Sequence, residues 1–303
     1  GNTALQKIRN FLVHELPAAE EPGGAGKKLR ILCMVYTHSN SHDRVRAIAE
    51  TYGPRCDGFM AASNVTDVEI GAVNILHDGP ESYDNMWSKV RSIWRYVYEH
   101  YLDEYDFFHL GGDDHYVIVE NLRHVVSTGS WRGPWNQSAP LYLGGPMVAF
   151  PNKFKRLCGG GAGYTLNRPA LKLLVEGLFY KQDCWPYWQT PKEDYNIASC
   201  FRYADVLCED TNDDRNETRY HQSNAYEHAR WKTSGRSVWR AGDLELYHGI
   251  TSKGELGQIS ETSVSFHLKV DATKRNPMPG HWVDNGVRRY DAILHDRCSD
   301  KSP

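Results

Sequence analysis

Short apolar runs recur through the first third of the chain. The run LRILCMVYT at 29–37 is almost continuously apolar, which is typical of a parallel strand buried on both faces. Shorter runs at 57–63, 72–78 and 106–110 also predict strands. This part of the chain therefore contains several predicted strands, connected by more polar segments.

The connecting segments have the spacing of amphipathic helices. Ser41 or Asp43 can cap a helix that a Gly-Pro pair ends. The clearest helix is predicted at 84–103, where apolar residues recur at steps of three and four, and another follows at about 118–127. Strands that alternate with helices predict an α/β domain with a mostly parallel central sheet. In such sheets ligands bind at the carboxyl ends of the strands.

The second half of the chain is less regular. The segment 140–147 predicts a strand and a turn, and 158–179 predicts a glycine-rich loop, a short strand and a helix that begins near Pro169. The alternating segment 261–270 predicts a strand, whereas 205–240 is polar and typical of loops. We find no internal repeat and no convincing linker.

A single domain is therefore predicted at 29–270. Residues 1–28 end in EEPGGAGKK and are expected to be a flexible lead-in, and 271–303 are expected to form a C-terminal extension. No apolar run approaches the roughly 20 residues of a membrane span. The opening glycine suggests that a signal or membrane anchor precedes this sequence in the full protein.

The charge balance excludes some classes of partner. The chain has 303 residues and a net charge of −3, which argues against a nucleic-acid or anionic-membrane partner, since both favour a basic surface. The abundant aromatic residues fit carbohydrate-facing surfaces, although aromatics more often fill a core.

Cysteines and glycosylation motifs bear on the cellular compartment. The seven cysteines have no CxxC spacing, so a structural zinc site is not expected. Three N-glycosylation motifs begin at Asn64, Asn136 and Asn216. Together with the cysteines they favour an oxidising, lumenal compartment.

The stretch GGDDHY at 111–116 is the most conspicuous candidate for chemistry. Asp113 and Asp114 follow a predicted buried strand and two glycines that allow close approach of a ligand. Adjacent carboxylates suit Mn²⁺ or Mg²⁺, ions that often bridge a protein carboxylate to a diphosphate. An Asx-type turn is the alternative interpretation, because aspartates are common in turns.

Other candidates are equally ambiguous when taken singly. Glu193 and Asp194 stand at a predicted helix start, where acids are favoured by the helix dipole or could include a general base. The GGGAGY loop at 159–164 could approach a phosphate or sugar, or form a tight turn. His267 lies in a predicted apolar strand and could be a metal ligand or a buried core residue. Lys89 or Arg91 could neutralise a phosphate group or simply be solvated at the surface.

The order of six segments resembles the inverting β1,3-glycosyltransferases of glycosyltransferase family 31, and most of all the core 1 branch, which adds galactose to GalNAc-Ser/Thr. LRILCMVYT with the later AETYGPRCD is similar to the first strand and the A-T-W-x-x-R-C segment of the family. GGDDHYVIVENLR resembles D-D-D-T-Y-V-I-x-x-N-L-R, and MWSKVRSIWRYVYEHYLDEYDFF resembles the lysine-bearing helix and strand before it. GGAGYTLNRPAL, KEDYNIASC and SVSFHL resemble G-G-A-G-Y-V-L-S, E-D-x-x-x-G-x-C and V-S-F-H.

The resemblance implies a GT-A (Rossmann-like) fold, a UDP-sugar donor, Mn²⁺ and inversion at the anomeric carbon. Asp114 and His267 match the family's metal ligands, and Asp113 matches the aspartate that lies against the donor nucleotide. Asp194 matches the proposed general base, with Glu193 beside it.

Further positions follow from the same resemblance. The expected donor-binding residues also include Thr37, Arg46, Lys89, Gly160 and Gly161. The implied disulfides join Cys33 to Cys56 and Cys184 to Cys200, while the pairing of Cys158, Cys208 and Cys298 stays open.

The sequence also departs from the family. Gly112 stands where the family has its first aspartate, and His115 replaces its threonine. Metal ligation would then depend on Asp114, His267, the diphosphate and water. The acceptor region at 205–260 and the segment after Val270 match poorly.

The sequence thus predicts a metal-dependent inverting glycosyltransferase of the Golgi lumen, anchored as a type II membrane protein. It would transfer a sugar, with galactose favoured, from a UDP-sugar to a glycan or glycopeptide acceptor through a β1,3 linkage. The alternatives are a β1,3-N-acetylglucosaminyltransferase and a catalytically silent glycan-binding or chaperone-like relative, which the substitution at Gly112 motivates. The donor sugar, the acceptor and the oligomeric state, for which a homodimer is one candidate, stay open.

Overall fold

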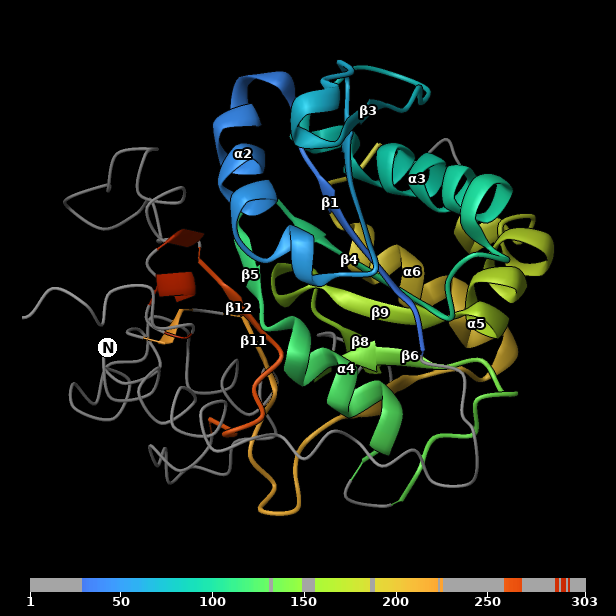
Figure 1. Cartoon of the computed structure of the whole chain (residues 1–303). Helices are drawn as coiled ribbons and strands as arrows, with labels where there is room; N and C mark the ends of the chain where they lie inside the picture. The colour runs from blue at the N-terminus through green and yellow to red at the C-terminus, as the bar shows by residue number, and fades with distance from the viewer. Residues whose placement is uncertain are drawn as a thin grey trace, which may run out of the picture.

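A computed structural model gives the fold of the chain (Figure 1). The described residues are 29–130, 133–148, 156–185, 189–222, 224–225, 259–268, 287, 288, 290–292 and 294. The predicted N-terminal segment 1–28, Cys298 and most of the predicted C-terminal extension lie outside them.

A seven-stranded sheet forms the centre of the molecule, and its strand order is β10-β6-β9-β4-β1-β2-β3. The strands are β1 (Ile31–Tyr36), β2 (Gly58–Ser63), β3 (Ala72–Asn74), β4 (Phe107–Gly112), β6 (Tyr142–Gly144), β9 (Tyr164–Asn167) and β10 (Cys208–Asp210). Within this sheet β9 runs antiparallel to both of its neighbours, and the other pairings are parallel. The predicted mostly parallel α/β sheet is thereby confirmed.

Helices cover both faces of this sheet (Figure 1). The α-helices are α2 (His42–Glu50), α3 (Met86–Tyr101), α4 (Val119–Thr128), α5 (Arg168–Lys172) and α6 (Glu193–Phe201), and a π-helical segment, Leu173–Leu178, continues α5. Apolar side chains of α2 and α4 pack on one face, and those of α3, α5 and α6 pack on the other.

Strand β1 explains why its sequence is apolar at nearly every position. Cys33 and Val35 point into the core beneath α2 and α4, whereas Leu32 and Met34 point into the core beneath α3. Alternate side chains of a strand face opposite sides of the sheet, so a strand covered on both sides is apolar throughout. The exposed fractions of these four side chains are 2% or less.

Several predicted boundaries shift. The strand predicted at 106–110 continues through Gly111 and Gly112, because these glycines pair with Val35 and Tyr36 of β1. The edge strand β3 is shorter than predicted: it pairs with β2 over three residues, and Ala72 also forms a bridge with Asp67. Ser41 precedes α2 as expected, but its side chain makes no capping hydrogen bond.

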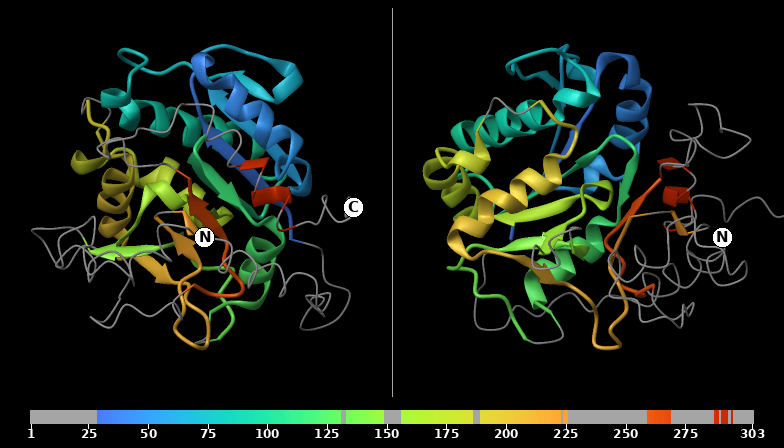
Figure 2. Two further views of the ribbon diagram at one scale, coloured as in Figure 1. Left: turned by 90° about the vertical axis from the view of Figure 1, so that its left-hand side faces the viewer. Right: turned by 180° about the vertical axis from the view of Figure 1, so that it is seen from behind.

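A smaller sheet stands beside the large one (Figure 2). It contains β11 (Tyr220–His221), β12 (Ser265–His267) and β5 (His115–Val117), in that order. Strand β12 runs antiparallel to β5, so that His267 lies opposite His115. The predicted strand at 261–270 is therefore a three-residue strand. A further pair, β7 (Pro146–Val148) and β8 (Arg156–Cys158), completes the sheets.

Three disulfides cross-link the domain. Cys33–Cys56 and Cys184–Cys200, the two pairs that the resemblance implied, are both formed. The third joins Cys158 of β8 to Cys208 of β10. Three disulfides fit an oxidising lumenal compartment.

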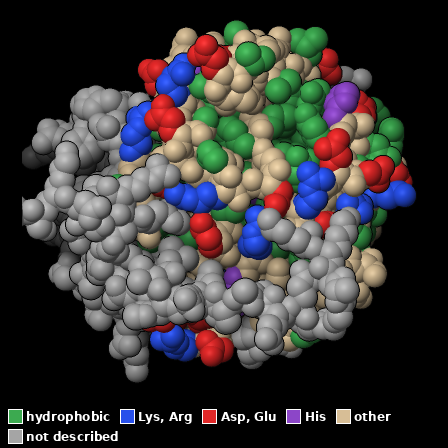
Figure 3. Space-filling view, viewed as in Figure 1, with side chains coloured by type: hydrophobic (Ala, Val, Ile, Leu, Met, Phe, Trp, Pro, Cys, Tyr) green, Lys and Arg blue, Asp and Glu red, His purple; other side chains and the backbone are tan. Residues whose placement is uncertain are grey.

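Some residues of the predicted C-terminal extension belong to the main core. Val287, Tyr290 and Leu294 are buried in the cluster that includes α2 and α4. Asp291 pairs with Arg55 at 2.6 Å. On the face shown in Figure 3, acidic and basic side chains are interspersed over the described surface. In the described part of the chain, no helix has both the length and the apolar character that a membrane crossing requires.

Candidate active site

Four segments converge at one edge of the large sheet. Strands β1 and β4 are parallel and end there, so Thr37 and the Asp113–Asp114 turn lie at neighbouring strand ends. Strand β9 is antiparallel and begins at this edge, immediately after the turn Gly160–Ala162. The first turn of α6 contacts that glycine turn. This is the edge at which α/β sheets bind ligands.

Asp114 and His267 form a pair across the two sheets. Asp114 Oδ2 lies 3.2 Å from His267 Nε2. The other ring nitrogen, Nδ1, lies 3.2 Å from the carbonyl oxygen of Gln222. A carbonyl oxygen and a carboxylate oxygen both only accept, so Nδ1 carries a proton, and Nε2 would either carry a second proton or bind a cation shared with Asp114.

These two side chains suit a hard divalent cation that takes its remaining ligands from a substrate. A carboxylate oxygen and a neutral imidazole nitrogen, oriented by a backbone carbonyl, are common metal ligands. Within the described residues, no group of three or more His, Cys, Asp or Glu side chains could hold a metal ion. Asp114 and His267 would therefore hold Mn²⁺ only together with diphosphate or water oxygens.

Asp113 is held by the end of β1 and the first turn of α2. Its Oδ2 accepts a hydrogen bond of 2.7 Å from Thr37 Oγ1, and its Oδ1 pairs with Arg44 Nη1 at 3.0 Å. Burial and the neighbouring Asp114 raise the pKa of Asp113, and the contacts with Thr37 and Arg44 oppose that rise. Arg46, the arginine expected here, instead lies 3.9 Å from Glu69.

The two candidate phosphate-binding cations of α3 have different surroundings. Lys89 is buried, and its Nζ contacts both Glu81 and the carbonyl oxygen of Thr37 at the end of β1. Arg91 is also buried, but it donates to the carbonyl oxygens of Phe179 and Cys184. Lys89 therefore lies at the candidate site, whereas Arg91 joins α3 to the segment that follows α5.

The adjacent acids at the start of α6 occupy different environments. Glu193 is buried, and its Oε2 accepts a hydrogen bond of 3.0 Å from the Tyr164 hydroxyl. Burial and the charge of Asp194 raise the pKa of Glu193 well above its ordinary value, which favours the protonated acid.

Asp194 is less deeply buried and accepts backbone hydrogen bonds. Its Oδ2 lies 2.9 Å from the backbone nitrogen of Gly160, and its Oδ1 lies 2.8 Å from that of Tyr195. Burial raises the pKa of Asp194, while these N–H donors favour the carboxylate and lower the pKa. Of the two acids, Asp194 is the better candidate for a base, because a base must be ionised.

The glycine turn separates the two acids of α6 from the Asp114–His267 pair. A Cβ atom on Gly160 would lie 2.5 Å from Glu193 Oε1, and one on Gly161 would lie 2.6 Å from His267 Nδ1. Both distances are shorter than ordinary Cβ contacts, so a side chain at either position would displace the Glu193 carboxyl group or the His267 ring.

Gln222 and Tyr36 are site residues that the sequence did not indicate. The Gln222 side chain contacts the carbonyl oxygen of Gly159 and the backbone nitrogen of Ala162, so it links the glycine turn to His267. Tyr36 ends β1, and burial together with the carboxyl groups of Glu193, Asp114 and Asp194 raises its pKa well above 10. The available sequence signal for Tyr36 was its place beside Thr37 at the end of the first predicted strand, whereas Gln222 carried none.

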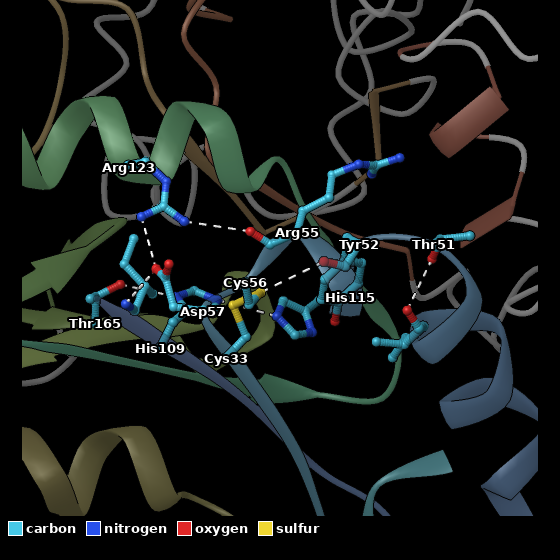
Figure 4. The surroundings of a disulfide bond; sticks show 12 residues. Cys33, Thr51, Tyr52, Arg55, Cys56, Asp57, His109, His115, Arg123 and Thr165 are labelled. Carbon is cyan, nitrogen blue, oxygen red and sulfur yellow. Dashed lines mark hydrogen bonds and ion pairs between the residues drawn. A yellow bond between two sulfur atoms is a disulfide. The ribbon is translucent and has the colours of Figure 1, made fainter. Parts of the chain in front are cut away.

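His109 of β4 and His115 of β5 are both buried (Figure 4). His115 Nδ1 contacts the carbonyl oxygen of Gly112, and His115 Nε2 lies 3.2 Å from His109 Nε2. His109 Nδ1 lies 2.9 Å from Thr165 Oγ1. His115 therefore supports the turn through its contact with Gly112.

The sequence is similar to two kinds of known glycan-synthesising enzyme. No protein-family model matches the chain. It is 29% identical over 215 residues to glycoprotein-N-acetylgalactosamine 3-beta-galactosyltransferase 1 of Xenopus laevis, a match that covers 70% of this chain and 56% of that protein. It is 28% identical over 116 residues to chondroitin sulfate synthase 3 of Mus musculus, which covers 36% of this chain and 12% of the synthase.

The chain thus matches little more than half the length of the galactosyltransferase and a small part of the synthase. The matches agree with the order of motifs and with the sheet, which has the arrangement expected of a GT-A fold. They confirm the resemblance indicated by the motifs: the chain is similar to a β1,3-galactosyltransferase and, over a shorter stretch, to a chondroitin sulfate synthase.

Proposed function

We propose that this chain is a Mn²⁺-dependent inverting glycosyltransferase. It would transfer galactose from UDP-galactose to a hydroxyl of a glycan acceptor such as GalNAc-Ser/Thr, with formation of a β1,3 linkage. One observation carries the proposal: the Asp114–His267 pair and the Glu193–Asp194 pair lie on either side of one glycine turn. This arrangement supports the proposal of a cation site and a base at one ligand-binding edge of the sheet.

The donor would bind between the ends of β1 and β4. Thr37, Arg44 and Asp113 form a connected polar group there, and Lys89 contacts the same strand end. Asp114 and His267 would hold Mn²⁺, which when bound neutralises negative charge on the UDP leaving group. Arg44 and Lys89 would add positive charge beside the diphosphate.

In the proposed reaction Asp194 would accept one proton, from the acceptor hydroxyl. The acceptor hydroxyl oxygen forms a bond to the anomeric carbon, and the bond from that carbon to the diphosphate oxygen breaks with its electron pair remaining on UDP. The hydroxyl proton passes to the Asp194 carboxylate. The Gly160 N–H and Tyr195 N–H hold that carboxylate in place and ionised.

Glu193 would support this step without exchanging the proton itself. Its raised pKa favours the neutral acid, so a second full negative charge beside Asp194 is avoided. The hydrogen bond from Tyr164 fixes its side chain beneath the glycine turn. Glu193 is thus assigned a positioning role and Asp194 the role of general base.

The Golgi lumen is the proposed location. Three disulfides and the relationship to a glycoprotein galactosyltransferase support a secretory-pathway enzyme. A type II membrane anchor outside this sequence is part of the same proposal.

A donor screen tests the proposed function. The purified chain is incubated with UDP-galactose, UDP-N-acetylglucosamine or UDP-glucose, with and without Mn²⁺, and UDP release is measured in the presence of a GalNAc-peptide. We expect release from UDP-galactose that requires both Mn²⁺ and acceptor, and a β1,3-linked product by mass spectrometry and NMR. If UDP were released from UDP-N-acetylglucosamine and from neither of the other donors, the assigned donor sugar would be N-acetylglucosamine and not galactose.

A catalytically silent, glycan-binding protein is the second candidate function. It is suggested by Gly112, which stands where the related motif has an aspartate, so that Asp114 and His267 would be the protein ligands of the metal. The same screen separates the two functions. No UDP release with any donor, together with no effect of Mn²⁺ on UDP binding, would reject the enzyme and favour the silent relative.

A further inference from the structure

Gly112 is enclosed by two side chains of the candidate metal site. A Cβ atom built on Gly112 would lie 2.6 Å from Asp114 Oδ1. It would also lie 3.2 Å from Cε2 and 3.5 Å from Cζ of the Tyr36 ring. The space beside the Gly112 backbone is therefore already filled by the Asp114 carboxylate and the Tyr36 ring.

The Asp114 carboxylate is constrained on both of its oxygens. Oδ1 lies over Gly112, and Oδ2 lies 3.2 Å from His267 Nε2. The backbone oxygen of Asp114 accepts a 2.7 Å hydrogen bond from the backbone nitrogen of Leu268, which fixes the turn against β12. Any displacement of Oδ1 must therefore rotate the carboxylate relative to His267.

Tyr36 limits where the carboxylate could move. Its backbone pairs with Gly112 in the register of β1 and β4, which fixes the point from which the ring extends over Gly112. The ring is partly buried and lies near the carboxyl groups of Glu193, Asp114 and Asp194. A side chain larger than a methyl group at position 112 would meet this ring as well as Asp114.

We propose that Gly112 is a positioning residue for the metal ligand Asp114. In this site Asp114 would be the one aspartate that binds the cation, and position 112 has to be free of a side chain. The inference rests on the proposed Mn²⁺-dependent function. On this basis an aspartate introduced at position 112 would not improve metal binding. Gly112→Asp and Gly112→Ala should both weaken Mn²⁺ binding, because each displaces Asp114 Oδ1.

The stability of these variants should change little in comparison with their metal affinity. The atom that a new Cβ displaces is the free end of a side chain, which can rotate at small cost. A supporting residue of a metal ligand typically contributes about 10–100-fold to metal affinity. We expect a loss of about 10-fold for Gly112→Ala and up to about 100-fold for Gly112→Asp.

The experiment measures Mn²⁺ affinity directly by titration calorimetry and by the electron paramagnetic resonance signal of free Mn²⁺, in the presence of saturating UDP. Asp114→Asn is the positive control for loss of the ligand. Gly177→Ala is the matched control. The new Cβ would lie at an ordinary distance of 3.6 Å from Leu173 Cδ1, and residue 177 is far in sequence from the Asp113–Asp114 turn. Thermal unfolding of each variant checks that the fold is retained.

The outcomes separate this inference from the proposed function. Weaker Mn²⁺ binding by both Gly112 variants, with unchanged binding by Gly177→Ala, supports the inference. Equal or tighter binding by Gly112→Asp would overturn it and leave the metal-dependent function intact. Absence of Mn²⁺ binding by the unsubstituted chain would overturn both.

Discussion

The Nε2 atoms of His109 and His115 lie 3.2 Å apart in the interior of the domain. Since the Gly112 carbonyl oxygen can only accept, Nδ1 of His115 carries a proton and donates it there. Nε2 of a neutral His115 is then an acceptor, so His109 donates from its own Nε2. His109 Nδ1 in turn accepts from the Thr165 hydroxyl. Neutral rings satisfy every contact in this series.

This arrangement predicts that acid destabilises the fold. Burial and the neighbouring His115 lower the pKa of His109 well below 6.5, so the native state binds fewer protons than the unfolded state. The free energy of unfolding should therefore fall as the pH drops below about 6.5, by up to about 1.4 kcal/mol per pH unit for one histidine. Urea unfolding between pH 7.5 and 5 measures the slope.

A substitution separates the contribution of His109 from that of His115, because burial also lowers the pKa of His115, to about 4. His109→Gln should reduce the acid-dependent loss of stability, although it also lowers stability at pH 7.5 by disturbing a buried hydrogen bond. His100→Gln is the control, because His100 is exposed on α3. An unchanged slope in His109→Gln would show that other groups cause the acid sensitivity.

Asp194→Asn is predicted to abolish turnover without loss of UDP binding. The amide cannot accept the acceptor proton, and removal of a general base typically costs about 10²–10⁴-fold in rate. Because Asp194 contacts Gly160 and Tyr195 and not the Thr37–Arg44–Asp113 group, donor affinity should be unchanged. Steady-state rates of UDP release and UDP titration calorimetry measure the two effects.

Glu193→Gln is the matched comparison, since an amide oxygen can still accept from Tyr164 and the side chain stays neutral, as the protonated acid is. We expect a loss of less than about 10-fold, below the range for removal of a base. If Glu193→Gln lost as much turnover as Asp194→Asn, the base would have to be reassigned to Glu193. In the pH–rate profile of the wild-type enzyme, the rate should fall on acidification with a midpoint above the ordinary pKa of aspartate. The reason is that burial raises the pKa of Asp194.

Arg44→Ala is predicted to weaken donor binding, whereas Arg46→Ala should not. Arg44 pairs with Asp113 at 3.0 Å, but Arg46 faces Glu69 and is largely exposed. If Arg44 binds the diphosphate as proposed, the loss of that charge-assisted hydrogen bond typically costs about 1.5–3 kcal/mol, which is roughly 10-fold or more in affinity. UDP titration of the two variants gives the comparison, and equal losses would remove the special role of Arg44.

The choice between these two arginines shows where sequence reasoning reaches its limit. Both lie in the helix after β1, but residues two apart on a helix are about 200° apart around its axis and point in different directions. The motif order indicated the helix α2, from which Arg44 contacts Asp113. Only the orientation of α2 relative to β4 decides which arginine reaches Asp113.

Much of the fold was predictable because its signals are local. The apolar run of β1 and the periodic spacing of α3 each follow from burial of one element, and both are present as predicted. Gln222 could not be predicted in this way, because its role depends on contacts with the glycine turn and with β12, which are distant in sequence. The same applies to the packing of Tyr290 in the core.

Removal of the Cys158–Cys208 disulfide is predicted to destabilise the domain more than removal of Cys184–Cys200. The two bonds close segments with sequence separations of 50 and 16 residues. In the loop-entropy account, such closures contribute about 4 and about 3 kcal/mol, because the longer loop restricts the unfolded chain more. Double alanine variants of each pair, compared by urea unfolding, test this order. Cys33–Cys56, with a separation of 23 residues, should fall between them, and a larger loss for Cys184–Cys200 than for Cys158–Cys208 would contradict the entropic explanation.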